Sequence, residues 1–161
     1  MTTFTIHSRQ TNDTRLFAEL LSKAGFASKL NVQAFVLPTT ARNGVPSSAY
    51  VKIDKEQILS KEIPEKSDIA VVLDSSIDEK LYKSSDTIIM NTKNKGKGIK
   101  AIDASKLSLD SIQKENIIPV LFGSTLKIFG EVSLKNAKTV LESEMGKGLY
   151  NAFEAGFKAI K

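Results

Sequence analysis

The chain has 161 residues, of which 41% are apolar and 25% are charged, with a formal net charge of +5. This composition is typical of one folded domain with a sizeable core and excludes a disordered chain. The absence of cysteine excludes disulfides, thiolate metal sites and iron–sulfur ligation, and a single histidine, His7, argues against a histidine-rich metal site.

The first segment predicts a strand over Phe4–Ile6, a polar loop over 7–12 and a helix that Thr11 or Asp13 caps and Gly25 ends. A strand, a loop and a helix N-terminus together favour an anion, which Arg9 and Asn12 would contact. The opposing interpretation is an ordinary loop, because it contains no glycine and its side chains would crowd a phosphate. A Ser-His-Asp triad would need His7, and no serine stands in a nucleophile elbow, so we predict no catalytic residue.

The stretch from Asn31 to Asp54 holds two predicted strands, Val32–Leu37 and Ala49–Ile53, around a turn rich in Pro, Thr and Asn-Gly. Arg42 stands there beside a bend rich in backbone N–H groups, which suits an anion or a partner's carboxylate. The alternative is a hairpin turn with a solvated arginine. The candidate contact residues in this turn are Thr39, Thr40, Arg42, Asn43 and Gly44.

In the middle of the chain, residues 55–65 are charged and predict an irregular or edge-like segment. Ile69–Leu73 is a continuous apolar run, typical of a buried strand. Asp74 follows it, either as a ligand contact at a strand's carboxyl end or as a helix cap for a short helix over 77–82. The lysine-rich segment 93–100 predicts either a phosphate or partner patch or a solvated turn.

Further strands are predicted over 87–90 and 99–102, and helices after Asp103 and Ser133 and at the C-terminus. Periodicity leaves residues 117–129 open between a strand and a buried helix. The helix after Ser133 should turn a set of side chains inward: Leu134, Ala137, Val140, Leu141 and Met145. Strands alternating with helices over 1–161, without a repeat or linker, predict one α/β domain with helices on both faces of the sheet.

Two groups of residues carry a family resemblance. The first comprises Gln33-Ala34-Phe35, the turn 41–46 and the strand 49–54; the second comprises Gly123, Lys127, Gly130 and 132–134. With the order of the other elements, including Asp68 before the apolar strand, the chain resembles the gamma subunit of pyruvate and other 2-oxoacid:ferredoxin oxidoreductases. The resemblance implies a three-layer α/β/α domain with a mixed, mostly parallel sheet, and packing roles for Lys127 and Gly130.

The resemblance also implies a function. The chain would be a non-catalytic subunit in the oxidative decarboxylation of a 2-oxoacid to an acyl-CoA, with electrons passing to ferredoxin. It would assemble with alpha, beta and delta-type subunits, which would hold the thiamine diphosphate and the iron–sulfur clusters. No cofactor is expected on this chain, and coenzyme A is a possible substrate contact.

The family's first loop has the form Gly-x-Gly-Gly-Gln-Gly, whereas residues 7–12 here read His-Ser-Arg-Gln-Thr-Asn. The chain therefore resembles a diverged member that lacks the glycine-rich loop. The alternative function is a stand-alone module that binds a small anion or nucleotide. We rank nucleic-acid binding last, because it rests on net charge alone and the chain resembles no nucleic-acid motif. No apolar run approaches the roughly 20 residues of a membrane span, and the N-terminus lacks a signal peptide pattern. We therefore expect a cytoplasmic protein.

Overall fold

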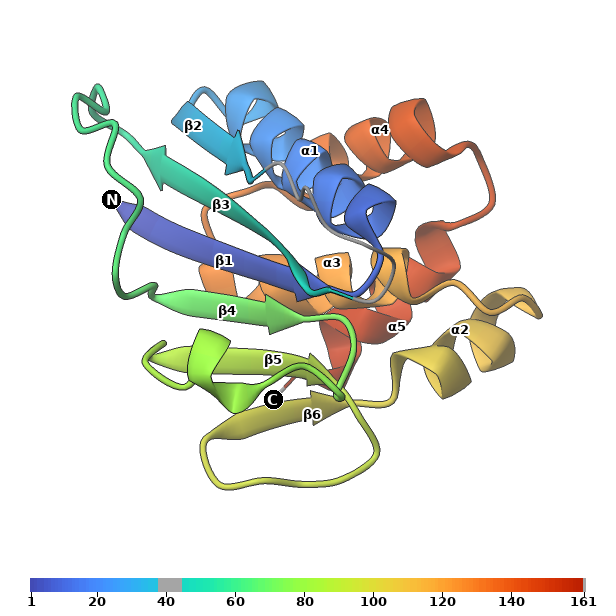
Figure 1. Cartoon of the computed structure of the whole chain (residues 1–161). Helices are drawn as coiled ribbons and strands as arrows, with labels where there is room; N and C mark the ends of the chain where they lie inside the picture. The colour runs from blue at the N-terminus through green and yellow to red at the C-terminus, as the bar shows by residue number, and fades with distance from the viewer. Residues whose placement is uncertain (38–44, 161) are drawn as a thin grey trace.

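The computed structural model describes residues 1–37 and 45–160. It contains a six-stranded sheet in the order β2-β3-β1-β4-β5-β6 (Figure 1). The strands are β1 Thr2–Ser8, β2 Asn31–Val36, β3 Ser47–Asp54, β4 Ile69–Val72, β5 Thr87–Asn91 and β6 Ile99–Ile102. β3 runs antiparallel to both of its neighbours, and the pairs β1–β4, β4–β5 and β5–β6 are parallel. The predicted mixed, mostly parallel sheet is confirmed.

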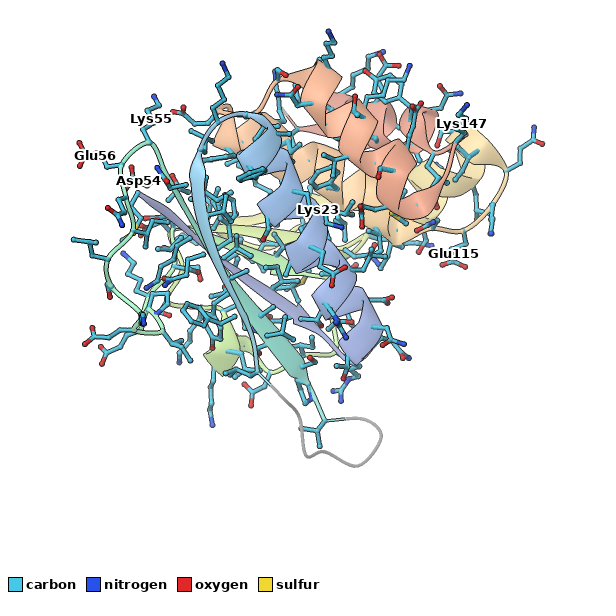
Figure 2. The ribbon with its side chains drawn as sticks, turned by 90° about the horizontal axis from the view of Figure 1, so that it is seen from above. Lys23, Asp54, Lys55, Glu56, Glu115 and Lys147 are labelled. Carbon is cyan, nitrogen blue, oxygen red and sulfur yellow. The ribbon has the colours of Figure 1, made fainter. Side chains whose placement is uncertain are left out.

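The α-helices gather on one face of the sheet, as the view along the sheet in Figure 2 shows. They are α1 Thr11–Ala27, α2 Ala104–Ile112, α3 Ile117–Phe129, α4 Leu134–Met145 and α5 Tyr150–Ala159. The alternate side chains Phe4 and Ile6 of β1 join Phe17, Phe122 and Phe153 in the main core. Phe17 packs edge-to-face on Phe122, which is tilted against Phe153, and Phe4 packs edge-to-face on Phe129; these contacts add to the stabilisation from burial.

The opposite face, which we call the second face, has a thinner cover. The 3₁₀ helix η1, Glu79–Leu81, and its flanks place Ile77 and Tyr82 over Val72 and Met90 in a smaller apolar cluster. Helical elements thus pack on both faces, and the predicted α/β class of a single domain is confirmed. The layer that covers the main core is thicker, because it contains the α-helices. The second face is covered by the mainly irregular segments that connect β3 to β4 and β4 to β5.

Residues 117–129, which periodicity left undecided, form helix α3 because two glycines allow it to pack directly on α5. A Cβ at Gly123 would lie 2.1 Å from the carbonyl oxygen of Phe153, and one at Gly156 would lie 1.9 Å from that of Val120. The last motif was expected to serve packing, which the structure bears out for Lys127 but not for Gly130, where an added Cβ would meet nothing within 4 Å. The Lys127 ammonium lies 5.0 Å from the ring centre of Phe157, and Gly130 ends α3 with φ +73°.

Three local predictions are wrong. Helix α1 does not end at Gly25 but continues to Ala27, because this glycine lies inside the helix where Val32 of β2 approaches it. Its N-cap is Gln10 rather than Thr11 or Asp13. Leu134, expected to point inward, has a side chain that is 43% exposed, since it is the first residue of α4 and lies beyond the core. Within the described ranges, no helix has both the length and the apolar character required to span a bilayer.

Candidate ligand site at the carboxyl edge of the sheet

Four parallel strands, β1, β4, β5 and β6, end at one edge of the sheet, here called the carboxyl edge. After β1 the chain builds β2 and β3 on one side, and then returns to add β4 on the other side. The strand order therefore reverses between β1 and β4. In open α/β sheets such a reversal creates the crevice in which ligands bind. The segments on either side of it are residues 8–12 and 73–76.

Arg9 joins these two segments. Its Nε donates to Ser76 Oγ at 2.6 Å, and its Nη2 donates to the carbonyl oxygen of Ser76 at 2.9 Å. The same Nε lies 4.0 Å from the Asp74 carboxylate. The guanidinium thus closes the crevice with two directed hydrogen bonds and a weaker ion pair.

Asp74 organises the turn that Arg9 holds. Its Oδ1 accepts hydrogen bonds from the backbone N–H of Ser76 at 2.9 Å and from the Ser76 hydroxyl at 2.7 Å. Partial burial opposes ionisation of this carboxyl, but the two Ser76 donors and then Arg9 outweigh it and lower the pKa of Asp74. Asp78, and not Asp74, caps η1, because its carboxylate accepts from Lys80 N–H. Asp74 therefore serves a local turn beside the crevice.

A hollow of about 410 Å³ lies further along the same edge, at the ends of β5 and β6. It is lined by Ser75, Asn91, Thr92, Lys93, Asn94, Asp103 and Ser105. The Asn91 amide fixes its floor by donating to the Leu73 carbonyl and accepting from the N–H of Ala104 at the start of α2. The exposed lysine-rich segment 93–100 borders this hollow. The hollow offers amide, hydroxyl and ammonium donors beside one carboxylate.

His7 is buried at the end of β1, on the second face. Its Nδ1 lies 2.9 Å from Ser48 Oγ on β3, while its Nε2 has no hydrogen-bond partner within the part of the chain that the structure describes. Burial lowers the pKa of His7 to about 4, so the imidazole is neutral at physiological pH. The side chain is 1% exposed and therefore lies out of reach of a substrate in this structure.

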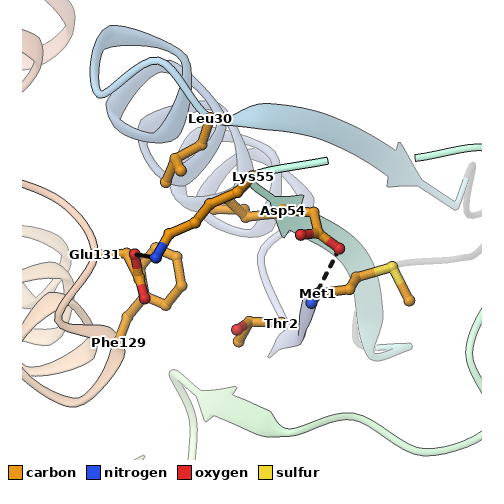
Figure 3. Close-up of a pocket in the computed structure, with 8 residues that line it drawn as sticks. Met1, Thr2, Leu30, Asp54, Lys55, Phe129 and Glu131 are labelled. Atoms are coloured by element: carbon orange, nitrogen blue, oxygen red, sulfur yellow. Dashed lines mark ion pairs between the residues drawn. The ribbon is translucent and has the colours of Figure 1, made fainter. Parts of the chain in front are cut away.

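A second cavity, of about 170 Å³, lies at the opposite edge of the sheet (Figure 3). Leu30, Ile53 and Phe129 form its apolar wall. Two ion pairs lie at it, one between the Met1 ammonium and Asp54 at 3.0 Å and one between Lys55 and Glu131 at 3.1 Å. Sequence reasoning missed this cavity, because its residues come from distant segments. They lie at the start of β1, at the end of β3 and at the end of α3. Its charges are matched in pairs, so the cavity combines an apolar wall with a rim of paired polar groups.

The structure places two of the residues predicted from the sequence. Arg9 lies at the crevice between β1 and β4, and Asn12 lies in the first turn of α1 at the same edge. The five predicted turn residues, Thr39, Thr40, Arg42, Asn43 and Gly44, lie outside the described residues, so their contact role stays a prediction. Sequence reasoning named Asp74 but missed Ser76, the residue through which Arg9 reaches it.

These features define an α/β domain with a candidate ligand site at the carboxyl edge of a mixed sheet. A model of the pyruvate ferredoxin/flavodoxin oxidoreductase family matches residues 4–161. The chain therefore belongs to this family. One curated relative is the common gamma subunit of the pyruvate/ketoisovalerate oxidoreductases of Pyrococcus abyssi, which is 27% identical over 141 residues, covering 78% of this chain and 76% of that one.

Solved structures share the fold. The gamma subunit of the keto/oxoacid ferredoxin oxidoreductase from Geobacter sulfurreducens superposes with a TM-score of 0.79 at 14% identity, covering 99% of this chain and 98% of that chain. A second match is the 2-oxoglutarate:ferredoxin oxidoreductase of Magnetococcus marinus, solved with 2-oxoglutarate, coenzyme A and succinyl-CoA bound. It superposes with a TM-score of 0.61 at 15% identity. The match covers 98% of this chain and 30% of that longer chain. The resemblance to gamma subunits that the sequence motifs indicated is confirmed.

Proposed function

We propose that this chain is the gamma subunit of a 2-oxoacid:ferredoxin oxidoreductase that oxidatively decarboxylates a 2-oxoacid to an acyl-CoA in the cytoplasm. Its companions are alpha, beta and delta-type subunits, and ferredoxin takes the electrons without a direct contact to this chain. The observation that carries the proposal is the family match over residues 4–161, supported by curated relatives that are themselves gamma subunits.

The chemistry of the chain supports a division of labour with those companions. A chain without cysteine supplies no thiolate to an iron–sulfur cluster, so the cluster ligands belong to other subunits. Thiamine diphosphate, which supplies the carbanion chemistry of decarboxylation when bound, is assigned to them as well. This chain would then lend structure and surface to a reaction centre built elsewhere.

Coenzyme A is the substrate that this chain would contact. The carboxyl edge presents the Arg9 guanidinium and the first turn of α1, two features that suit a phosphate. In place of the family's glycine-rich loop, residues 7–12 carry side chains, and Arg9 spends two of its donors on Ser76. We propose that this diverged loop contacts coenzyme A through side chains rather than through open backbone. Arg9→Ala in the assembled enzyme should then raise KM for coenzyme A about tenfold at little change in KM for the 2-oxoacid.

The test of the subunit assignment is native purification. A tagged copy, expressed from its own locus under strictly anaerobic conditions, is isolated together with whatever it binds. We expect companion chains that contain thiamine diphosphate and iron, and coenzyme A-dependent reduction of ferredoxin or a viologen dye by a 2-oxoacid. A chain that elutes alone at physiological concentration, without bound thiamine diphosphate or activity, would refute the assignment. A thermal shift of that lone chain with coenzyme A or nucleotides would then establish the stand-alone binding module instead.

A further inference from the structure

The strand β2 forms one outer edge of the sheet and is unusually apolar for such a position. Of the strands that the structure describes, it pairs with β3 alone. Within Asn31–Val36 no residue is buried, and Val36 and the following Leu37 each have a 37% exposed side chain. The sequence carries no charge between Lys29 and Arg42. Proteins normally protect an exposed edge with lysine, proline or a bulge, because its backbone groups pair readily with another strand.

The backbone register shows which groups point outward. Leu37 N–H donates to the carbonyl of Ser48 at 3.2 Å. The backbone N–H and C=O groups of Leu37, and of every second residue before it, therefore point toward β3. By the alternation of an antiparallel ladder, the N–H and C=O groups of Val32, Ala34 and Val36 face away from the sheet. Among residues 1–37 and 45–160, no strand pairs with this row of donors and acceptors.

Apolar side chains lie on both sides of this strand. Val36 and Ala34 are exposed on the face that carries the α-helices, while Phe35 is half-buried on the second face, opposite Tyr50 of β3. Val45, just before β3, is 50% exposed. The edge therefore offers apolar side chains on both faces of the sheet.

The other outer edge of the sheet is built differently. β6 has four residues, and the exposed Lys100 lies within it. The loop before it adds Lys93, Lys95 and Lys97, and within residues 1–37 and 45–160 none of these four lysines forms an ion pair. Such a lysine-rich edge repels a second strand. The same chain thus protects one edge and leaves the other apolar, which indicates that β2 is covered in the working protein.

We propose that a companion subunit of the oxidoreductase covers β2 by adding a strand to this edge. This inference rests on the proposed function. The occupant is an extended, largely uncharged segment that pairs with the outward backbone groups of Val32, Ala34 and Val36. In the Magnetococcus marinus enzyme the same fold makes up 30% of one longer chain, so there the remaining chain is available to cover the domain. Backbone pairing supplies the affinity, and the side chains on both faces supply the specificity.

Two substitutions test this docking in the purified complex. Ala34→Pro removes an N–H that faces away from β3, so it blocks a new strand without removing a β2–β3 hydrogen bond. Ala34→Lys adds charge to the edge while every backbone group stays in place. The matched control is Leu109→Lys, which places the same charge on a 49% exposed leucine of α2. Circular dichroism and thermal unfolding of each isolated variant establish that it is folded.

The expected result is that both Ala34 variants recover at least about tenfold less companion subunit than the wild type, while Leu109→Lys recovers it normally. Companion recovery equal to the wild type with both Ala34 variants would overturn the inference, while the wild-type complex would still support the proposed function. Light scattering of the isolated chain tests whether the edge pairs two copies of this chain instead. That alternative holds if the wild type is a dimer, Ala34→Lys dissociates it, and the recovery of companion subunits is unchanged. If the wild type itself recovers no companion, the proposed function fails, and this inference fails with it.

Discussion

The burial of His7 makes the stability of this chain depend on pH in a window that can be stated in advance. The imidazole has an ordinary pKa of 6.5 when the chain is unfolded and a pKa of about 4 in the folded state, lowered by burial. Between these values the unfolded chain binds a proton that the folded chain does not. Lowering the pH through this window therefore favours unfolding, and raising it restores stability.

The size of the effect follows from the two pKa values. Their separation limits the loss to about 3 kcal/mol, and at about pH 4.5 the expected loss relative to neutral pH is ~2.5 kcal/mol. Screening by solvent reduces this little, since the side chain is 1% exposed. The free energy of unfolding of a domain is typically about 5–15 kcal/mol, so this one group removes a large share of it.

Urea unfolding followed by circular dichroism, from about pH 7.5 down to about pH 4.5, measures the effect. His7→Asn serves as the reference variant, because its amide can still reach Ser48 but does not titrate. We expect the wild type to lose ~2.5 kcal/mol more than His7→Asn over this range. Because His7 is the one histidine of the chain, its NMR titration is unambiguous. Parallel pH profiles for the two proteins, or a folded-state pKa near 6.5, would refute the reasoning.

Three further outcomes follow from contacts in the fold. Gly123→Ala should destabilise the chain by about 2–4 kcal/mol in urea unfolding, because its Cβ would lie 2.1 Å from the backbone oxygen of Phe153. Gly96→Ala, whose Cβ would meet the end of a flexible isoleucine at 3.0 Å, should lower the free energy of unfolding far less. Equal losses of stability in the two variants would contradict the close packing of α3 on α5. Asn136→Ala removes the hydrogen bonds from α4 to the end of α1 and should cost about 1 kcal/mol, measured in the same way. Lys52→Met should speed amide hydrogen exchange in residues 55–65, because the buried ammonium donates to two carbonyls of that segment. The increase in exchange there should exceed what the loss of global stability alone would cause. Unchanged exchange in residues 55–65 would show that other contacts anchor the segment.

The sequence predicted the elements of this fold where local signals are strong. Ser133 caps α4 as expected, because a serine before a helical stretch can accept from the N–H of Asn136, here at 3.2 Å. A continuous apolar run located β4, since a strand buried on both faces needs apolar side chains on both. The hairpin of β2 and β3 was likewise predicted from its β-branched flanks.

The errors have a common physical origin in contacts between distant segments. Glycine often terminates helices, so the sequence predicts a helix end at Gly25, whereas in the fold this glycine lets Val32 pack against the helix. Nothing local to residues 117–129 could distinguish a strand from a helix that packs on α5 through glycine. In the same way, Arg9 and Asp74 were identified separately, but their common partner Ser76 emerges only when the parallel strands bring residues 8–12 and 73–76 to one edge.

The carboxyl edge and the β2 edge are connected through one hairpin. β2 is parallel to β1 in space, so its end at Val36 and the start of β3 at Ser47 both lie toward the carboxyl edge, where Arg9 closes the crevice. A companion strand paired with β2 would therefore run to the edge at which the family's substrates are proposed to approach. The gamma-type domain would then act less by chemistry of its own than by fixing a companion chain at a defined register beside that crevice.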